Sequence, residues 1–263
     1  MKKYFLCLIL CVCIISQCSF LVCAKNEEFS WYCVRNKEHL QPKADANMSF
    51  IEKYNGYYVD KNHPSTSEEK VIYLTFDAGY ENGNIERILN VLKEQNVPAA
   101  FFVLENLISK NPELILRMDA EGHTVCNHTS SHKAITKYED INALKSELEG
   151  LEAQYKALTG NDMKKYLRPP EGRFDQRSMS FLNELGYKTV FWSFAYADWD
   201  NNKQISEEAA KQKIFENIHN GEIMLLHPTS ATNANILSDV ISKLRAEGFR
   251  FGTLDELTCE QGI

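Results

Sequence analysis

The sequence has few cysteines outside its first two dozen residues and no run of basic residues. Five of the eight cysteines lie at or before Cys23, which leaves Cys33, Cys126 and Cys259. Three scattered cysteines do not form a disulfide framework, and none has the close spacing of a structural zinc site. No lysine and arginine run is interleaved with aromatics, and the net charge is −7, so a nucleic-acid partner is disfavoured.

Low-complexity segments and internal repeats are also absent, which excludes a disordered or solenoid protein. Hydrophobic residues make up 44% of the 263 residues and charged residues 25%, an ordinary balance for a globular domain with a sizeable core. The length suits one large domain or two small ones. No feature of the sequence indicates an oligomer, so we expect a monomer.

The amino terminus has the pattern of a secretory leader. Lys2 and Lys3 precede an apolar run over residues 4–15, and Val22-Cys23-Ala24 resembles a small-residue cleavage site. The run is shorter than the ~20 residues that a bilayer-spanning helix needs. We therefore predict a signal peptide over residues 1–24 and action outside the cytoplasm. The alternative is an uncleaved membrane anchor, and removal of the leader would lower the net charge from −7 to about −9.

The remaining chain divides at about residue 70. Residues 25–69 are polar with aromatic patches, and we interpret them as an extension packed on the main domain, residues 70–263. There, short apolar runs alternate with helical stretches, which predicts βα units around a parallel sheet. About seven units favour a distorted, incomplete (β/α) barrel, with an open doubly wound sheet as the alternative. The predicted strands are 71–76, 99–103, 123–127, 166–168, 189–192, 222–226 and 249–251, and the helices lie near 84–95, 112–122, 139–158, 174–185, from 206, and 236–247.

Polar residues follow several of these strands. Parallel α/β proteins place their active sites at the carboxyl ends of the strands, so these side chains are candidates for chemistry. They are Asp77, His128, Arg168, Asp198 and His227.

Two histidines and one aspartate suggest a hydrolytic site. His128 and His132 are four residues apart, and on a helical turn both imidazoles would face one divalent ion. One capping and one exposed histidine would explain an isolated pair equally well. Asp77 leaves a buried strand for a loop that contains glycine, where it could act as a general base. An aspartate that closes the strand in an Asx turn is the structural alternative.

The other candidates fit the same chemistry. Arg168 begins the motif Arg-Pro-Pro-Glu-Gly, in which the paired prolines fix the chain and aim the next free backbone N–H, that of Glu171, inward. His227 could protonate a leaving amine while Asp198 keeps it charged and oriented. Trp199 is equally suited to the core or to a wall that stacks on sugars.

Together, in this order and spacing, these elements closely resemble the NodB-type polysaccharide deacetylases, carbohydrate esterase family 4, over residues 71–257. The likeness is greater to one branch, the δ-lactam-biosynthetic de-N-acetylases of spore-forming bacteria, and the aromatic extension with His39 and Pro42 fits that branch. The segments that carry it are TFDAGYENG at 75–83, YLRPP at 166–170, VFWS at 190–193, LLH at 225–227 and NA at 233–234.

The resemblance implies a metal-dependent mechanism. His128 and His132 would hold a divalent metal, zinc before cobalt or manganese, that polarises the acetamide carbonyl and activates a water. Asp77 would take the water's proton. The other residues carried over are Arg168, which orients the base, the Glu171 N–H, which meets the oxyanion, His227 with Asp198, which protonates the amine, and Tyr80 and Trp199, which contact the substrate.

One position departs from the wider family. The acid that usually follows the base is the third metal ligand there, and this chain has Ala78. Water, the substrate, Asn82 or Glu81 could complete the metal, or the site could work with less help from it. The δ-lactam branch often lacks this acid. Cys126, two residues before His128, is interpreted as a core residue rather than a ligand.

The resemblance implies three alternative functions. The first is removal of the N-acetyl group of muramic acid in peptide-stripped peptidoglycan, which allows the muramic δ-lactam of spore cortex to form. The second is deacetylation of N-acetylglucosamine in peptidoglycan or chitin-like chains. The third is a wall-binding protein without catalysis, which the retention of Asp77, Arg168 and His227 disfavours.

Overall fold

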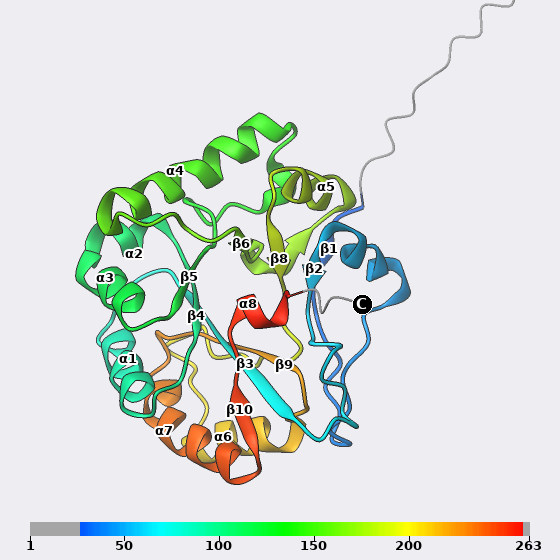
Figure 1. The fold of residues 1–263 in the computed structure, drawn as a ribbon, viewed down its shortest axis with the longest axis vertical. Helices are drawn as coiled ribbons and strands as arrows, with labels where there is room; N and C mark the ends of the chain where they lie inside the picture. Colours follow the sequence, from blue (N-terminus) through cyan, green and yellow to red (C-terminus); the bar gives the residue numbers. More distant parts are fainter. Residues whose placement is uncertain (1–26, 260–263) are drawn as a thin grey trace, which may run out of the picture.

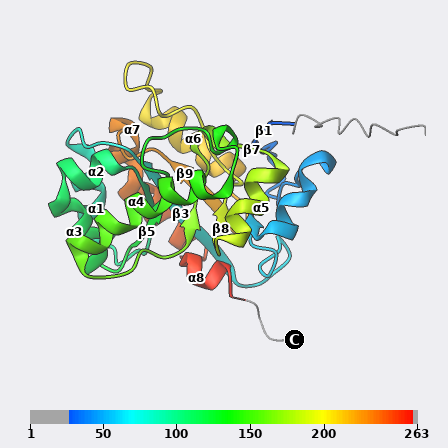
Figure 2. The same ribbon diagram turned by 90° about the horizontal axis from the view of Figure 1, so that it is seen from above.

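The structure is a computed structural model and describes residues 27–259. The predicted signal peptide lies outside the described residues. Within them, no helix combines the length and the apolar character that crossing a bilayer requires. Figure 1 shows a curled sheet at the centre with helices around its outside, and Figure 2 shows the same ribbon from above.

The central sheet has eight strands, and its named strands pair in parallel. The order is β10-β3-β4-β5-β6-β8-β2, with β9 also paired to β3. The strands are β2 (Gly56–Tyr57), β3 (Lys70–Ala78), β4 (Ala100–Val103), β5 (Thr124–Asn127), β6 (Tyr166–Leu167), β8 (Lys188–Val190), β9 (Glu222–Leu226) and β10 (Phe249–Phe251).

The long strand β3 explains why the barrel is distorted. The carbonyls of Ile72 and Ala78 accept from residues that follow β10 and β4, whereas the carbonyl of Val71 accepts from the residue before β9. Carbonyls of alternate residues point to opposite edges of a strand, so β10 and β4 share one edge of β3 and β9 lies on the other. β9 forms no ladder with β8 itself and meets the chain after β8 through an isolated bridge between Phe194 and Met224 and through hydrogen bonds with Ser193. The predicted incomplete barrel is confirmed.

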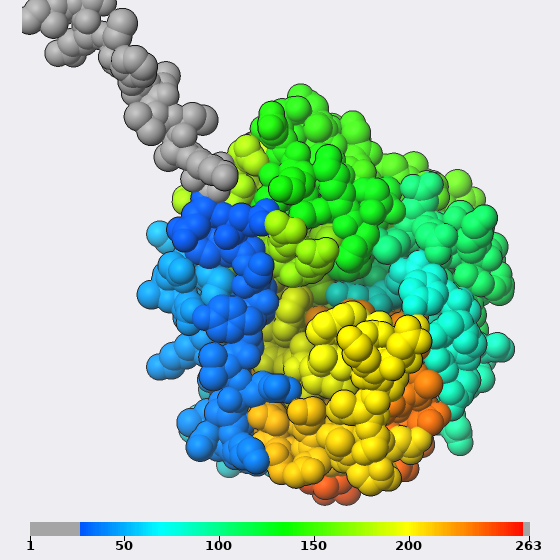
Figure 3. All heavy atoms as spheres, turned by 180° about the vertical axis from the view of Figure 1, so that it is seen from behind, coloured from blue at the N-terminus to red at the C-terminus, as the bar shows by residue number. Residues whose placement is uncertain are grey.

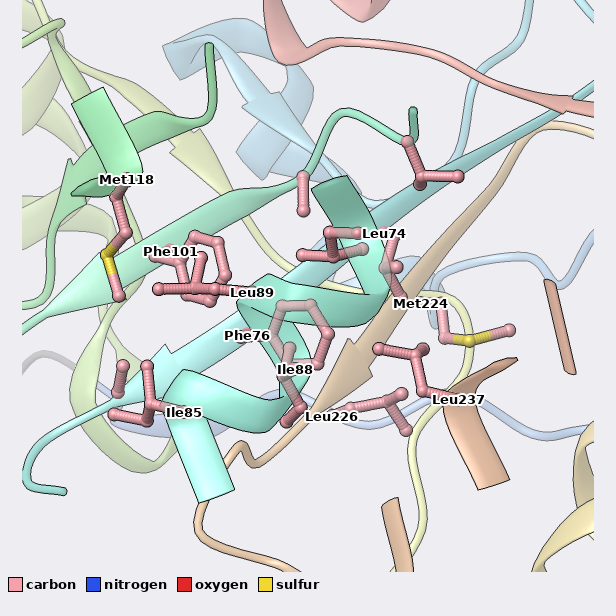
Figure 4. Packing of buried hydrophobic residues seen from close by; sticks show 14 of the residues in the cluster. Leu74, Phe76, Ile85, Ile88, Leu89, Phe101, Met118, Met224, Leu226 and Leu237 are labelled. Atoms are coloured by element: carbon pink, nitrogen blue, oxygen red, sulfur yellow. The ribbon is translucent and has the colours of Figure 1, made fainter. Parts of the chain in front are cut away.

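The helices form the outer layer. They are α1 (Asn84–Glu94), α2 (Glu105–Lys110), α3 (Pro112–Ala120), α4 (Ile141–Thr159), α5 (Gln176–Glu184), α6 (Glu207–Asn217), α7 (Ala231–Ala246) and the short α8 (Leu254–Leu257). Alternation along β3 sends Leu74, Phe76 and Ala78 outward to pack with these helices, as Figure 4 shows for the first two. The opposite face of β3 points into the barrel, where Val71 and Tyr73 pack with α8 residues. Asp77 therefore faces the barrel interior.

The helix predictions were partly wrong at their boundaries. α7 begins at Ala231 rather than near residue 236, because the Ser230 hydroxyl accepts from the Asn233 N–H and caps the helix before its apolar pattern becomes regular. α2 was not predicted, because its six residues are too few to show a helical period. The helix predicted from Ser206 is present, and the Ser206 side chain caps it.

The amino-terminal extension is more closely joined to the barrel than predicted. Strand β1 (Phe29–Ser30) pairs with β7 (Arg173–Phe174), and the 3₁₀ helix η1 (Ala46–Tyr54) packs on α5. Strand β2 pairs with β8, and Val59 bridges to Glu222 at the start of β9. The extension thus lies between β8 and β9 and contacts both of them.

Candidate active site

The predicted polar residues meet at the carboxyl ends of the barrel strands. Figure 3 shows this face, where the yellow segment near residue 200 borders a recess and the blue amino-terminal extension lies along one side of the face. Asp77 belongs to the end of β3, His128 follows β5, Arg168 follows β6, and His227 follows β9. Asp198 lies on the long connection between β8 and α6 and reaches His227.

Arg168 and Asp77 form a buried ion pair. The Arg168 Nη1 donates to Asp77 Oδ1 at 2.8 Å, and Arg168 has no exposed surface. Its other N–H groups donate to the carbonyls of Val190 and Phe191 and to the Thr75 hydroxyl. Burial raises the pKa of Asp77, but the charge of Arg168, with His128 and His227 adding to it when they are protonated, outweighs burial, so the pKa lies below its ordinary value. Asp77 is therefore a carboxylate at neutral pH.

His128 is held by the backbone of the arginine. Its Nδ1–H donates to the Arg168 carbonyl at 2.8 Å, which leaves Nε2 facing Asp77 Oδ2 at 3.6 Å. Burial lowers the pKa of His128 to about 4, so the imidazole is neutral at pH 7 with a lone pair on Nε2. A neutral imidazole with its other nitrogen bonded to a carbonyl is the usual form of a histidine that ligates metal.

His132 approaches His128, but not by the predicted route. The ring centroids are 5.0 Å apart, yet the segment is a loop in which Thr129 has φ 70° and His132 has φ 57°. The prediction of a helical turn was wrong. The Asn127 side chain accepts from the Thr129 N–H at 2.8 Å and supports this left-handed turn, which folds the two imidazoles together.

Two imidazoles fit part of a site for a divalent metal, and the rest of the ligand set is missing. Among residues 27–259, no cluster of three or more His, Cys, Asp or Glu side chains is arranged to hold a metal. Ala78 is buried in the core. Asn82 donates to the Thr229 carbonyl and accepts from Asn84, while Glu81 accepts from the first turn of α1. Both side chains are thus already hydrogen-bonded within the protein.

His227 and Asp198 form a second pair. His227 Nδ1 donates to Asp198 Oδ1 at 2.7 Å, while Asp198 Oδ2 accepts from the His227 backbone N–H at 2.8 Å and from Asn233 Nδ2 at 2.6 Å. Burial lowers the pKa of His227, but the hydrogen bond and charge of Asp198 outweigh it, and the pKa is raised. The pair therefore favours the protonated imidazole, as a proton donor requires.

The loop after Arg168 has a strained backbone. Glu171 has φ 57° and Gly172 has φ 64°, and such a conformation costs about 1–3 kcal/mol at a residue other than glycine. The Glu171 side chain is exposed. The loop lies beside Trp192, because a Cβ placed on Gly172 would come within 2.8 Å of the Trp192 ring.

Two exposed aromatic residues border the site. Trp199 is 62% exposed and its ring centroid lies 6.4 Å from that of His227. Tyr80 is 45% exposed, and its hydroxyl accepts from Asn201 Nδ2 at 2.8 Å. That bond joins the loop after β3 to the loop that carries Trp199. Of the two interpretations of Trp199, a core residue is wrong.

Residues 65–190 match the polysaccharide deacetylase family. The chain is 38% identical over 237 residues to the peptidoglycan-N-acetylmuramic acid deacetylase PdaA of Bacillus subtilis. The match covers 90% of this chain and 88% of that protein. The chain belongs to the polysaccharide deacetylase family.

Solved structures support the same membership. Bacillus subtilis PdaA, described as a family 4 carbohydrate esterase, superposes with a TM-score of 0.83 at 38% identity, covering 88% of this chain and 97% of that one. A family 4 carbohydrate esterase from Bacillus anthracis gives 0.72 at 37% identity, with coverages of 88% and 96%. The Listeria monocytogenes peptidoglycan-N-acetylglucosamine deacetylase PgdA is 31% identical over 202 residues, 75% of this chain and 41% of that protein.

Several residues of this deacetylase were not predicted as part of the site. Asn127 and Asn233 support His128 and Asp198 through their side chains, and Thr75 accepts from Arg168. The Arg168 guanidinium also lies 5.8 Å from the Trp192 ring. Asn127 had one sequence signal, its position directly before His128, whereas Thr75, Trp192 and Asn233 lie in segments that carry the family resemblance. Cys126 is buried in the barrel interior, as predicted.

Proposed function

We propose that the protein hydrolyses the N-acetyl group of muramic acid in peptidoglycan glycan strands and releases acetate, outside the cytoplasm. The freed amine would allow the muramic δ-lactam of spore cortex to form. The observation that carries the proposal is a carboxylate fixed by a buried arginine, Asp77 with Arg168, together with a second, protonatable pair, His227 with Asp198. The likeness to PdaA supports muramic acid as the substrate, because it spans 90% of the chain.

Asp77 is the general base in this proposal. Its pKa is lowered by the cations around it, so it is ionised and can take a proton from the attacking water at neutral pH. The Arg168 guanidinium is held by two backbone carbonyls and Thr75, which fixes one carboxylate oxygen and leaves the other, Oδ2, toward His128.

His128 and His132 would hold the divalent metal, with zinc before cobalt or manganese. Such an ion supplies Lewis-acid polarisation of the acetamide carbonyl. The backbone carbonyl that accepts from His128 Nδ1 fixes the tautomer that presents Nε2. With Ala78 in the core and Asn82 and Glu81 bound elsewhere, the protein provides two imidazoles, so we expect weak metal affinity.

His227 is the general acid. Asp198 keeps its Nδ1 protonated and stabilises the imidazolium, so Nε2–H can donate to the amine nitrogen as the C–N bond breaks and acetate leaves. The Glu171 backbone N–H would donate to the oxyanion that forms at the carbonyl carbon. Trp199 and Tyr80, exposed at the rim, would stack against sugar rings of the strand.

A second candidate function is deacetylation of N-acetylglucosamine. The likeness to the Listeria enzyme PgdA supports it, although that match covers 75% of the chain against 90% for PdaA. Both reactions require the same base and acid. They differ in the substrate, because muramic acid carries a lactyl group on the oxygen next to the acetamide.

The test is acetate release from peptide-stripped peptidoglycan and from chitin oligomers. Wild-type protein would be assayed after chelation and after zinc, cobalt or manganese is returned, beside Asp77→Asn. Asp140→Asn is the matched control, because the Asp140 side chain bonds to the first turn of α4, to Asn142 and Ala143, and asparagine caps equally well. We expect metal-stimulated release from muramic residues and a loss of about 10²–10⁴-fold in Asp77→Asn alone.

Other outcomes decide between the alternatives. Release from chitin oligomers and none from muramic residues would establish the glucosamine deacetylase. Intact glycan binding with no release under any metal would refute catalysis and leave the wall-binding protein. Full activity in Asp77→Asn would remove Asp77 as the base.

A further inference from the structure

The loop that carries Glu171 is in a strained conformation that it cannot hold by itself. Glu171 and Gly172 are consecutive left-handed residues, with φ 57° and 64°. Backbone of this kind persists only where the surroundings over-determine it. Pro169 and Pro170 fix the chain before the loop. The restraint after it comes from elsewhere in the sequence.

That second restraint is the amino-terminal extension. The Trp31 backbone N–H donates to the Gly172 carbonyl at 2.8 Å, and the Trp31 indole donates to the Trp192 carbonyl at 2.8 Å. Gly172 lies between the two tryptophans, since a Cβ there would be 2.8 Å from the Trp192 ring and 3.2 Å from the Trp31 Cβ. Trp31 is 4% exposed, so its position is fixed by packing.

An ion-pair chain reinforces the contact at the surface. Arg173 donates through Nε to Glu28 at 3.0 Å and through a second N–H to the same carboxylate, and its Nη1 lies 3.5 Å from Glu171 Oε2. Thr136 donates to the other Glu28 oxygen. Pairing of Ser30 with Arg173 in the β1–β7 ladder fixes the register of these contacts.

We propose that residues 28–31 of the extension are positioning residues for catalysis: through Trp31 and the Glu28–Arg173–Glu171 chain they hold the Glu171 N–H at the angle that meets the oxyanion. The inference rests on the proposed function, in which that N–H is the donor. Glu28 contacts Arg173 and Thr136, and Trp31 contacts the loop and the core, so both would act through Glu171 rather than on the substrate. Their effect is exerted on the transition state, because the oxyanion exists only there.

The expected effect is therefore on kcat rather than on KM. Loss of one oxyanion donor costs about 10²–10³-fold in kcat, and a donor that is present but misdirected should lose a part of that. An interaction made only in the transition state lowers kcat and kcat/KM equally and leaves KM unchanged. A purely structural role of the extension would change stability instead.

The test uses the full chain with Glu28→Ala, Trp31→Phe and the double variant. Phenylalanine keeps a ring in the core and removes the indole N–H. Lys37→Ala is the matched control, because Lys37 also ties the extension to the domain, at 2.8 Å from Glu216, without touching the loop. The measurements are kcat, KM, melting temperature and the NMR shift and hydrogen exchange of the Glu171 and Gly172 amides.

We expect the double variant to lose about tenfold or more in kcat with KM within twofold, and its two amides to shift and exchange faster. Lys37→Ala should change none of these. Unchanged kcat and unchanged amides in the double variant, or a loss of kcat equal to that of Lys37→Ala, would overturn the proposal. If wild-type protein releases no acetate from any substrate, the proposed function fails, and the amide measurements still decide whether the extension holds the loop.

Discussion

Asp198→Asn should convert His227 from a proton donor into a neutral imidazole. Both Asp198 oxygens accept hydrogen bonds: Oδ1 from His227 Nδ1, and Oδ2 from the His227 backbone and from Asn233. Asparagine has one acceptor oxygen and one NH₂ group. The oxygen must take the Oδ2 position, where two donors converge, so the NH₂ group faces His227 Nδ1. That nitrogen must then accept, and it can no longer carry a proton.

General magnitudes for a hydrogen bond to a charged group give the size of the effect. A hydrogen bond to a charged group contributes about 1.5–3 kcal/mol, and one pKa unit corresponds to about 1.36 kcal/mol, so loss of the pair lowers the His227 pKa by roughly 1–2 units. Burial and the Arg168 charge, which both lower the pKa of His227, are then opposed by the charge of Asp77 alone. A general acid works only while protonated, so activity is lost as pH rises through its pKa. The alkaline limb should move to lower pH by about 1–2 units.

The assay is acetate release as a function of pH for wild type, Asp198→Asn and Asn233→Ala. Asn233→Ala removes one donor to Asp198 but keeps its charge, so its alkaline limb should move by less than about half a unit. In Asp198→Asn the loss should be large at pH 8 and small at acid pH. A uniform loss at every pH, with the limb in its wild-type position, would refute the electrostatic role and leave Asp198 a role in orientation alone.

Two further variants test burial and the arginine. His123 is 7% exposed, neither ring nitrogen has a hydrogen-bond partner among the described residues, and burial lowers its pKa from 6.5 to about 4. Only the unfolded chain binds that proton between these values, so stability should fall by up to about 3 kcal/mol as pH drops from 6.5 to 4. His123 packs against Phe101, so His123→Phe should keep the packing and remove this pH-dependent loss of stability, measured by urea unfolding. An equal loss of stability in the variant and in wild type would contradict the prediction. Arg168→Lys should lower the free energy of unfolding by more than about 3 kcal/mol and remove nearly all activity, because an ammonium cannot reach the four acceptors of the guanidinium. A free energy of unfolding within about 1 kcal/mol of wild type would contradict this.

The succession of strands along the chain and the place of the candidate site were predictable, because both follow from local patterns in the sequence. Apolar runs such as residues 71–76 and 222–226 are buried strands, and polar residues directly after them reach the carboxyl edge of a parallel sheet. Boundaries failed where a cap overrides periodicity, as at Ser230. Strand β2 has two residues and pairs with β8, 130 and more positions away, and no local pattern carries that information.

Within the site, the sequence indicated which side chains come together but not how they are held. His128 and His132 do meet, yet they do so through left-handed residues supported by Asn127, whereas a spacing of four suggested a helix. The support of Asp198 by Asn233 is likewise a contact between positions 35 residues apart. A side chain that supports another by one hydrogen bond has no characteristic spacing, so only the folded chain identifies it.

The positions of the site residues along the chain indicate that the extension belongs to the same domain as the site. Residues 65–190, the part that matches the family, contain the proposed base Asp77, the two histidines and the Glu171 loop. The proposed acid pair lies beyond that region, with Asp198 on the connection after β8 and His227 at the end of β9. Strand β2 pairs with β8, and Val59 bridges to β9, so the extension joins these two strands. Its first residues pair with β7, beside the Glu171 loop. The proposed base and acid are themselves brought together by the direct pairing of β3 with β9, in which Phe76 lies opposite Leu226, and the extension closes the barrel on the other side of β9, toward β8.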